Sequence, residues 1–455
     1  MKIAIAGYGV EGHSNLRYFR SRFPEATFFI ADERPVNDAP EDVTVLMSER
    51  VFVQQLKEMD MVVRTAGLPP REIVTNGKVW SATNEFFARC PAPIIGVTGT
   101  KGKGTTCSLI ASILRAAGRT VHLVGNIGVP ALDVLGDIRS EDVVVYELSS
   151  FQLWDLERSP QIAVVLMIEP DHLDVHADFE EYITAKGNIR RHQHIWDTCL
   201  YHPTNHHSEA VAATPFTGLL DTEGVASCDM CGDSGLRFAS RYGIPDDGEV
   251  YVKDATFYKG DHAICGVDTL HIAGQHNVEN ACAAISAVYA LDESVSDEAV
   301  AQGLSAFTGL PHRLKFVAEK DGVRFYDDSI STTPGSAIAA LRAFNQPKVM
   351  ILGGSDKGAD YSTLAQEFVN SDSLRSVLLV GSNAERIATV LRQAGLSDAL
   401  MMQKGRISMT EVVQAAIDLA RPGDVVVLSP AAASFDQYKN YSDRGEQFVA
   451  AVEAL

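Results

Sequence analysis

Short apolar runs that alternate with segments of helical periodicity are the feature of this sequence that most restricts its fold. The strand-like runs are Lys2–Ala6, Ala26–Ala31, Met61–Arg64, Ile94–Thr98, Thr120–Val124, Val143–Tyr146, Ile162–Ile168, Lys348–Leu352, Ser376–Val380 and Asp424–Leu428. Strands that are separated by helices usually pair in parallel, because the helix carries the chain back to the starting edge of the sheet. The sequence therefore predicts an α/β fold.

Two interruptions divide this pattern. Cys90–Pro93 places two prolines close together, and the helical periodicity stops again at Phe307–Pro311. Closely spaced prolines and glycines are typical of linkers. Between Asp197 and Ala273 the sequence is irregular, with short alternating pieces such as Glu249–Lys253, and predicts a small β-rich elaboration before a helix at Val278–Leu291. We expect three α/β domains, at residues 1–92, 93–307 and 308–455.

The charge balance restricts the partners. The chain has 39 Lys and Arg against 59 Asp and Glu, a formal net charge of −20. Such a surface does not attract nucleic acids or anionic membranes in bulk, so a phosphate must be held locally. No apolar run is long enough to span a bilayer, the first residues do not read as a signal peptide, and the seven scattered cysteines favour a reducing compartment. We expect a cytoplasmic protein without membrane insertion.

One pair of these cysteines has the spacing of metal ligands. Cys228 and Cys231 are separated by two residues, with His202, His206 and His207 about 20 residues away. Structural zinc sites need four ligands at closer spacing. We therefore interpret the pair as ordinary thiols in an irregular segment.

The clearest local motif is the glycine-rich segment Gly96–Thr106, between a predicted strand and a predicted helix at Ser108–Ala117. Glycines let backbone N–H groups surround a polyphosphate, while a lysine reaches the terminal phosphates and a hydroxyl binds Mg²⁺. The usual spacing has glycine at position 97 and a hydroxyl at 104, but this chain has Val97 and Gly104. The segment predicts a variant phosphate loop in which Thr105, or else Thr106, binds the metal. A turn without a ligand is the alternative.

Two further groups follow neighbouring strands. Glu147 ends the run Val143–Tyr146, and Glu169–His172 follows Ile162–Ile168. Ligands of open parallel sheets bind at the carboxyl ends of the strands, where the phosphate loop also lies. A carboxylate and an imidazole beside nucleotide phosphates predict a Mg²⁺–nucleotide site. Each residue also has an ordinary alternative role, Glu147 as a helix cap and His172 as a surface side chain.

The N-terminus carries a second, weaker nucleotide motif. Gly7–Gly12 reads GYGVEG directly after a strand, and Asp32 ends the next one. In dinucleotide-binding folds the glycines allow close approach of a pyrophosphate, and the acid binds a ribose hydroxyl. The motif is compatible with a nicotinamide cofactor and equally with another nucleoside diphosphate such as a UDP-sugar.

Taken together, the motifs resemble the Mur ligase family of ATP-dependent amino-acid ligases over essentially the whole chain. The matching segments are TGTKGKGTT (98–106), GNIGVP (125–130), ELSSFQL (147–153), DHLD (171–174), AK (185–186), GQHNVENA (274–281), FTGLPHR (307–313), DDS (327–329), LGGSDKGAD (352–360) and SPAAASFDQYKNYSDRG (429–445). The resemblance implies a Rossmann-like N-terminal domain, a P-loop ATPase central domain and a Rossmann-like C-terminal domain. GNIGVP, FTGLPHR and the last segment resemble the glutamate-adding members.

The resemblance also implies residue roles. Those implied to bind ATP are Gly99, Thr100, Lys101, Gly102, Lys103, Gly104, Thr105, Thr106, Asn277, Arg313 and Asp328. The implied catalytic or metal-binding residues are Lys103, Thr105, Glu147, His172 and Lys186, with Lys186 carbamylated and two Mg²⁺ bound. The implied substrate-binding residues are Val10, Glu11, Asp32, Glu33, Arg34, Gly67, Asn126, Thr332, Lys357, Ser434, Phe435 and Tyr441.

The reaction implied by the resemblance is the addition of glutamate to UDP-N-acetylmuramoyl-alanine through an acyl phosphate, by a monomer. Two departures from the family pattern bear on this expectation. The GKGT order at 102–105 is similar to folylpolyglutamate synthases, and Ile330 replaces a lysine common beside the amino-acid pocket. D-glutamate is favoured, and the L-glutamate-adding variant is an alternative.

Three alternatives differ more widely. A folylpolyglutamate synthase-like ligase would account for GKGT but not for the N-terminal nucleotide motif. A nicotinamide oxidoreductase would use that motif and leave the phosphate loop without a role. A non-catalytic nucleotide-binding homologue would not require Lys103, Glu147, His172 and Lys186 together.

Overall fold

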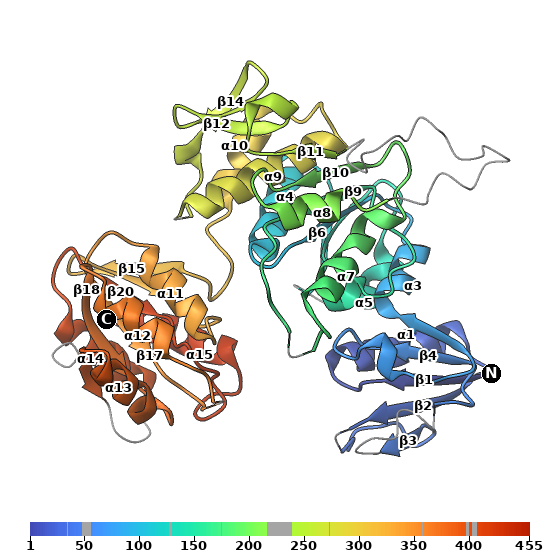
Figure 1. Ribbon diagram of the computed structural model, residues 1–455, viewed down its shortest axis with the longest axis horizontal. Helices are drawn as coiled ribbons and strands as arrows, with labels where there is room; N and C mark the ends of the chain where they lie inside the picture. The colour runs from blue at the N-terminus through green and yellow to red at the C-terminus, as the bar shows by residue number, and fades with distance from the viewer. Residues whose placement is uncertain are drawn as a thin grey trace. The chain divides into compact units, whose positions relative to one another are not determined.

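The chain folds into three sheets flanked by helices and one small antiparallel sheet, in the part that the structure describes (Figure 1). The computed structural model describes residues 1–33, 35–47, 56–126, 130–173, 175–215, 239–272, 274–356, 358–396, 400–402 and 407–455. Within these residues, no helix is both long enough and apolar enough to cross a membrane. Cys228 and Cys231 lie outside the described residues.

The first sheet has five parallel strands in the order β3-β2-β1-β4-β5. Its strands are β1 (Lys2–Ala6), β2 (Thr27–Asp32), β3 (Thr44–Met47), β4 (Met61–Arg64) and β5 (Lys78–Ser81), and its helices are α1 (Val10–Arg22) and α3 (Ala82–Arg89). The glycine-rich turn joins β1 to α1, as the N-terminal motif predicts.

The second sheet has six parallel strands in the order β11-β10-β9-β6-β8-β7. The strands are β6 (Ile94–Thr98), β7 (Val121–Gly125), β8 (Val143–Glu147), β9 (Ile162–Val165), β10 (Thr198–Tyr201) and β11 (Ala239–Arg241). Its helices are α4 (Lys103–Ala116), α5 (Ala131–Val134), α6 (Ser150–Leu153), α7 (Phe179–Arg191), α8 (His206–Ala212), α9 (Gln275–Leu291) and α10 (Asp297–Ala306). Because every pair is parallel, the carboxyl ends of β6, β8 and β9 lie at the same edge of the sheet.

A three-stranded antiparallel sheet follows, formed by β12 (Val250–Lys253), β13 (Thr256–Lys259) and β14 (His262–Gly266). It confirms a small β-rich elaboration before helix α9. The elaboration is smaller than predicted, because β10 and β11, which fall in the predicted range, belong to the second sheet.

The third sheet has the order β15-β16-β20-β17-β18-β19, and only the β15–β16 pair is antiparallel. Its strands are β15 (Lys315–Lys320), β16 (Val323–Asp327), β17 (Lys348–Leu352), β18 (Leu374–Leu379), β19 (Leu400–Met402) and β20 (Val425–Leu428), and its helices are α11 (Pro334–Arg342), α12 (Ser362–Val369), α13 (Ala384–Gln393), α14 (Met409–Leu419) and α15 (Tyr441–Glu453). Met350 and Leu352 of β17 belong to one hydrophobic cluster, and Val349 and Ile351 belong to another. This alternation shows that helices cover both faces of the sheet.

By compactness the described chain forms two units. One contains residues 1–270 and 276–306, and the other contains residues 271–275 and 307–455. In the first unit a single hydrophobic cluster extends from the first sheet into the second. Phe86 and Phe87 of α3 contact the ring of Tyr146 in β8, with centroid distances of 5.4 and 5.5 Å. The domain boundaries at residues 92 and 308 stay a prediction.

Several element boundaries differ from the sequence-based expectation by one to five residues, and two of these differences lie at the predicted site. Helix α4 begins at Lys103 rather than at Ser108, because the left-handed backbone of Gly102 turns the chain directly into the helix. Strand β9 ends at Val165 rather than at Ile168. The following backbone instead bonds to other segments: the Met167 carbonyl accepts the Thr100 N–H at 2.9 Å, and the Ile168 N–H donates to Asn205.

The C-terminal core provides a stability test. Phe448 of α15 is completely buried, whereas Phe316 of β15 is 48 % exposed. Phe448→Ala is expected to lower the free energy of unfolding by about 3–5 kcal/mol, because a buried aromatic ring leaves a cavity. Phe316→Ala, the matched control, should cost roughly 1 kcal/mol or less, since its ring is already half in water. Urea denaturation measures both changes, and equal losses would contradict the assignment of this core.

Candidate active site

The predicted phosphate loop connects β6 to α4 through two glycines with positive φ. Gly99 has φ +147° and Gly102 has φ +85°, a left-handed conformation that side chains disfavour. A Cβ atom on Gly102 would lie 2.5 Å from Oδ1 of Asn280. Because Gly102 occupies the N-cap position without a side chain, it cannot cap α4 itself. The first N–H groups and the positive end of the helix dipole therefore suit an anion.

Two lysines from different helices meet at this loop. Nζ of Lys103 donates to the carbonyls of Gly99 and Thr100 at 3.1 and 3.0 Å. Nζ of Lys186, on α7, donates to the same Gly99 carbonyl at 3.0 Å and to Oγ1 of Thr98 at 3.2 Å. The structure thus brings together two predicted site residues that are far apart in the sequence.

Lys186 lies in an environment that disfavours its charge. Its side chain is only 1 % exposed, and Nζ lies 4.6 Å from the centre of the Tyr182 ring. Burial and the neighbouring Lys103 ammonium hold the pKa of Lys186 well below its usual range, and Asp171 opposes this shift. A lowered pKa makes the neutral amine, which is the form that acts as a nucleophile, easier to reach than in a surface lysine.

The hydroxyls of α4 are not equivalent. Thr106 is completely buried, and its Oγ1 donates to Oδ1 of Asn280 at 3.3 Å. Nδ2 of Asn280 in turn donates to Oδ1 of Asn277, so Asn277, which the resemblance implies contacts adenine, lies close to the loop. Thr105 is 7 % exposed. The commitment of Thr106 to Asn280 supports Thr105 as the metal-binding hydroxyl.

Glu147 ends β8 at the same edge of the sheet. The register pairs Glu147 with Val97 of β6 and with Gly125 of β7. Its Oε1 accepts a hydrogen bond of 3.2 Å from Nδ2 of Asn126, whose backbone N–H donates to the Glu147 carbonyl. The contact places Asn126, a predicted substrate residue, directly beside a predicted metal ligand.

His172 is more exposed than the other predicted metal-binding residues. Its backbone has φ +54°, its side chain is about half exposed, and its Nε2 lies 3.6 Å from Oδ2 of Asp171. The ring lies beside Phe151, at a centroid distance of 4.9 Å. No contact within the described residues joins His172 directly to Glu147 or Lys186, so its role as a metal ligand stays a prediction.

The donors at this edge fit a magnesium ion that is bound together with phosphates. Among the described residues, no group of three or more His, Cys, Asp or Glu side chains is close enough to hold a metal by itself. Mg²⁺ in nucleotide sites takes one or two protein oxygens and completes its shell with phosphate oxygens and water. The Thr105 hydroxyl and the Glu147 carboxylate are oxygen donors of the required kind.

The first sheet gathers the predicted nucleotide-sugar residues at the ends of β1, β2 and β4. Oδ2 of Asp32 accepts the backbone N–H of Tyr8 at 2.7 Å, and Oε2 of Glu11 accepts the N–H of Ala66 at 2.9 Å. Burial raises the pKa of Glu11, although the Ala66 N–H and Arg64 oppose the shift. Both acids therefore fix the glycine-rich turn and the loop after β4.

The remaining predicted residues of this group are more exposed. Val10 is 78 % exposed, and Glu33 and Gly67 are also exposed. Arg34 lies outside the described residues. Exposed residues beside a glycine-rich turn are available to a ligand, and their substrate-binding role stays a prediction.

In the second unit, Asp328 follows β16 and is buried. Its Oδ1 accepts the Leu314 N–H at 3.1 Å, and its Oδ2 accepts the Ser429 hydroxyl at 2.7 Å. Burial raises the pKa of Asp328 to about 6, while these donors and Arg313 oppose the shift. Arg313, the other predicted nucleotide residue of this unit, is thus close enough to Asp328 to lower its pKa.

Three of the predicted amino-acid residues, Ser434, Phe435 and Tyr441, lie in the chain after β20. Ser434 is buried and its carbonyl accepts the Tyr438 N–H, whereas Phe435, Tyr441 and Thr332 are exposed. Lys357 lies outside the described residues. The carbonyl of Tyr441 accepts the Ser329 hydroxyl at 2.8 Å, which ties the start of α15 to the end of β16.

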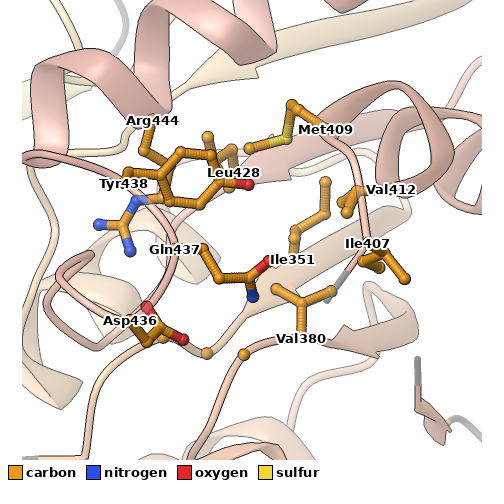
Figure 2. Close-up of a pocket in the computed structure, with 13 residues that line it drawn as sticks. Ile351, Val380, Ile407, Met409, Val412, Leu428, Asp436, Gln437, Tyr438 and Arg444 are labelled. Atoms are coloured by element: carbon orange, nitrogen blue, oxygen red, sulfur yellow. The ribbon is translucent and has the colours of Figure 1, made fainter. Parts of the chain in front are cut away.

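A small pocket lies beside these residues at the ends of β17, β18 and β20. Figure 2 shows the polar side chains of Asp436, Gln437 and Arg444 on one side and aliphatic side chains such as Val380 and Val412 on the other. Arg444 donates to the carbonyls of Ser329 and Ala432, and burial lowers its pKa to about 10. None of the predicted site residues lines this pocket.

Sequence reasoning missed several residues that hold the site together. Oγ1 of Thr100, a residue predicted to bind ATP, also bonds to both backbone groups of Glu169 and lies 3.0 Å from the hydroxyl of Tyr182. Tyr182 and Asn280 were not predicted. Asn280 lies in GQHNVENA and Tyr182 lies one helical turn before Lys186, so these positions were the available signals.

Two family models match most of the chain. The model described as "Mur ligase middle domain" matches residues 97–288, and "Mur ligase, glutamate ligase domain" matches residues 312–432. A protein of Symbiobacterium thermophilum named UDP-N-acetylmuramoylalanine–D-glutamate ligase is 35 % identical over 100 % of this chain and 98 % of its own length. The chain belongs to the Mur ligase family. A protein of the same name from Acetivibrio thermocellus is 34 % identical over 100 % of this Mur ligase and 96 % of its own length.

Solved structures agree on the fold of this Mur ligase. The UDP-N-acetylmuramate–alanine ligase MurC of Thermotoga maritima matches with a TM-score of 0.60 and 16 % identity, covering 100 % of this chain and 99 % of its own. The MurF ligase of the same organism, solved with ADP, matches with a TM-score of 0.58 and 16 % identity over 99 % of this chain and 94 % of its own. The predicted three-domain Mur ligase architecture of α/β type is thereby confirmed.

The phosphate loop of this Mur ligase generates a binding prediction. Gly102→Ala is expected to weaken binding of a non-hydrolysable ATP analogue by at least about tenfold, because the added Cβ meets Asn280 and a left-handed backbone costs about 1–2 kcal/mol. Gly118→Ala is the matched control, since Gly118 also has positive φ, +80°, but has no atom within 4 Å of the added Cβ. Calorimetric titration measures both, and equal weakening would contradict the role of the loop.

Proposed function

We propose that this chain is an ATP-dependent ligase that adds D-glutamate to UDP-N-acetylmuramoyl-L-alanine during peptidoglycan precursor synthesis in the cytoplasm. The observation that carries the proposal is the convergence of Lys103 and Lys186 on the Gly99 carbonyl at the phosphate loop. The proposal is supported by the full-length similarity to relatives named D-glutamate ligases. A folylpolyglutamate synthase would leave the first sheet, with Asp32 and Glu11 at its nucleotide motif, without a role.

Two chemical steps make up the proposed reaction. First, the alanine carboxylate of the UDP-linked substrate attacks the γ-phosphorus of ATP, forming an acyl phosphate and releasing ADP. Next, the neutral amine of glutamate attacks the acyl carbon and an amide bond forms. Inorganic phosphate leaves with the pair of electrons from the broken C–O bond, and the nitrogen releases one proton to the solvent. Little covalent work falls to the protein, so its residues align the reactants and neutralise charge.

The phosphate loop carries the nucleotide in this proposal. Lys101, Lys103 and the N–H groups from Gly99 to Thr106 hold the phosphates, while Asn277 contacts adenine. Arg313 and Asp328 of the second unit bind the nucleotide as well. The ammonium of Lys103 lies beside the loop carbonyls and is placed to neutralise charge at the terminal phosphate.

Two Mg²⁺ complete the proposed site. The protein ligands are Thr105, Glu147, His172 and a carbamate on Lys186. The carbamate forms when the neutral Nζ attacks the carbon of CO₂, an N–C bond forms, and a proton is released. When bound, the ions polarise phosphate oxygens and screen their negative charge. The oxygen donors at this edge of the sheet are those that Mg²⁺ prefers.

The substrates occupy the two ends of the chain in this proposal. The UDP moiety binds at the first sheet, with Val10, Glu11, Asp32, Glu33, Arg34 and Gly67, and Asn126 faces the muramoyl group. Glutamate binds in the C-terminal unit, at Thr332, Lys357, Ser434, Phe435 and Tyr441. We propose three domains, residues 1–92, 93–307 and 308–455, working as a monomer.

The reaction assay tests the function directly. Sustained ADP release, beyond one equivalent per enzyme, is expected only when ATP, UDP-N-acetylmuramoyl-L-alanine and D-glutamate are all present, because the acyl phosphate is consumed only when glutamate attacks it. L-glutamate, dihydrofolate and NADH serve as the comparison substrates in parallel assays. ADP release with L-glutamate but not with D-glutamate, in otherwise identical assays, would overturn the stereochemical assignment. ADP release with the folate but not with the UDP-linked substrate would overturn the proposed function.

Lys186 provides a second test of this mechanism. Lys186→Ala is expected to lower kcat at least about a hundredfold, since the site loses an anion for Mg²⁺, and added formate or acetate should restore part of the activity. Carbamate formation needs the neutral amine, so the carbamylated fraction rises as pH rises through the lowered pKa of Lys186. Lys320→Ala, a variant at the end of the edge strand β15, is the control. Near-normal activity of unrescued Lys186→Ala would contradict the assignment.

A further inference from the structure

We propose that Arg64 is a positioning residue, which fixes the loop after β4 against the segment that begins with α6 and thereby places the UDP-linked substrate relative to the phosphate donor. This inference rests on the proposed function and assigns a role to a residue that none of the family motifs includes. Arg64 ends β4 and is completely buried. A buried guanidinium requires a partner for its charge and for its N–H groups.

The guanidinium holds both segments at once. Nη1 donates to the carbonyls of Thr65, Ala66 and Leu68 at 3.3–3.4 Å. On the other side, Nε donates to Oδ2 of Asp155 at 2.8 Å and Nη2 donates to Oδ1 of the same carboxylate. The planar guanidinium, with its five N–H donors in fixed directions, thus links the loop after β4 to the segment after α6.

The loop that Arg64 holds, residues 65–68, belongs to the nucleotide-sugar end of the first sheet. The Ala66 N–H donates to the Glu11 carboxylate at 2.9 Å, so the loop is bonded to α1 as well. A Cβ atom on Gly7 would lie 2.1 Å from Oγ1 of Thr65, which shows that the loop packs directly on the glycine-rich turn. Gly67, a proposed substrate residue, lies at the exposed side of this loop.

The other end of the contact leads to the proposed metal site. Nη2 of Arg64 also donates to the carbonyl of Phe151 at 3.0 Å. The ring of Phe151 stacks on His176, with a centroid distance of 5.4 Å and an interplanar angle of 12°, and lies beside His172. Arg64 therefore touches, through one residue, the segment that carries a proposed Mg²⁺ ligand.

A second polar contact accompanies Arg64 across the same boundary. Nδ2 of Asn84, on α3, donates to the Asp155 carbonyl at 2.8 Å, and its Oδ1 accepts the Glu157 N–H at 2.8 Å. Because these bonds do not involve Arg64, Asn84 is expected to preserve the general packing of the two sheets when Arg64 is replaced. A change at Arg64 is thus expected to affect the loop first, and misplacement of a reacting group by about 1 Å costs roughly a hundredfold in rate.

The experiment compares three variants of the full chain. Arg64→Lys keeps the charge but loses the fork, and Asp155→Asn keeps the shape but loses the charge of the partner. Arg20→Lys is the control, because Arg20 forms a comparable two-point contact with Asp42 at the surface of the first sheet. For each variant we would measure kcat, the KM for UDP-N-acetylmuramoyl-L-alanine and the Kd for a non-hydrolysable ATP analogue, with concentrations normalised by analogue-binding stoichiometry.

Arg64→Lys is expected to raise this KM and to lower kcat by about tenfold each, with the Kd for the ATP analogue changed less than about twofold. Asp155→Asn should change both parameters in the same direction, and the double variant should be no worse than Arg64→Lys alone, because the two residues act as one unit. Arg20→Lys should leave all three values unchanged. If Arg64→Lys does not fold, Asp155→Asn decides the question by the same readouts.

Several outcomes would overturn the inference. A purely structural role predicts fewer folded molecules with normal kcat and KM for each of them. Equal weakening of the ATP analogue, or additive effects in the double variant, would also contradict a role confined to substrate placement. An inactive wild-type chain would overturn the proposed function and this inference together, whereas an active wild type with normal variants overturns the inference alone.

Discussion

The carbonyl of Gly99 receives two lysine side chains, and most of the proposed site depends on this contact. Lys103 reaches it from the first turn of α4, and Lys186 reaches it from α7. Burial disfavours the charged form of Lys186 and repulsion from the neighbouring Lys103 ammonium adds to this effect, so the pKa of Lys186 falls well below that of a surface lysine. The repulsion is relieved by loss of a proton from Lys186, by its conversion into an anion, or by phosphates that bind beside Lys103. Two charged lysines are therefore unfavourable at this loop without an anion, whereas a bound polyphosphate compensates their charge.

Much of the fold could be predicted from the sequence, because the apolar runs have the length and composition of buried parallel strands. The β1, β4, β6 and β17 boundaries were predicted without error. Errors occur where the backbone bonds to distant segments instead of to a neighbouring strand. After Val165, the Met167 carbonyl bonds to Thr100 and the Ile168 N–H bonds to Asn205. Periodicity reports burial and carries no information about such bonds.

The site residues divide in the same way, into those whose position follows from a strand end and those whose position depends on a distant contact. The positions of the phosphate loop and Glu147 could be predicted because each lies at the carboxyl end of a strand, the edge at which open parallel sheets bind ligands. Tyr182, Asn280 and Arg64 were not predictable, since their roles depend on partners 82, 174 and 91 residues away. Lys186 is intermediate: the resemblance indicated it, and only the structure showed that it is buried against the loop.

The continuous core between the first and second sheets has a consequence for synthesis on the ribosome. Phe86 and Phe87 present a buried aromatic face whose partner ring, Tyr146, is translated about 60 residues later. At about 5–20 residues per second, the nascent first sheet waits roughly 3–12 s with this face uncovered. During that interval α3 exposes the kind of apolar surface that chaperones bind. The first sheet, about the first fifth of the chain, thus completes its own folding only when the next sheet is made.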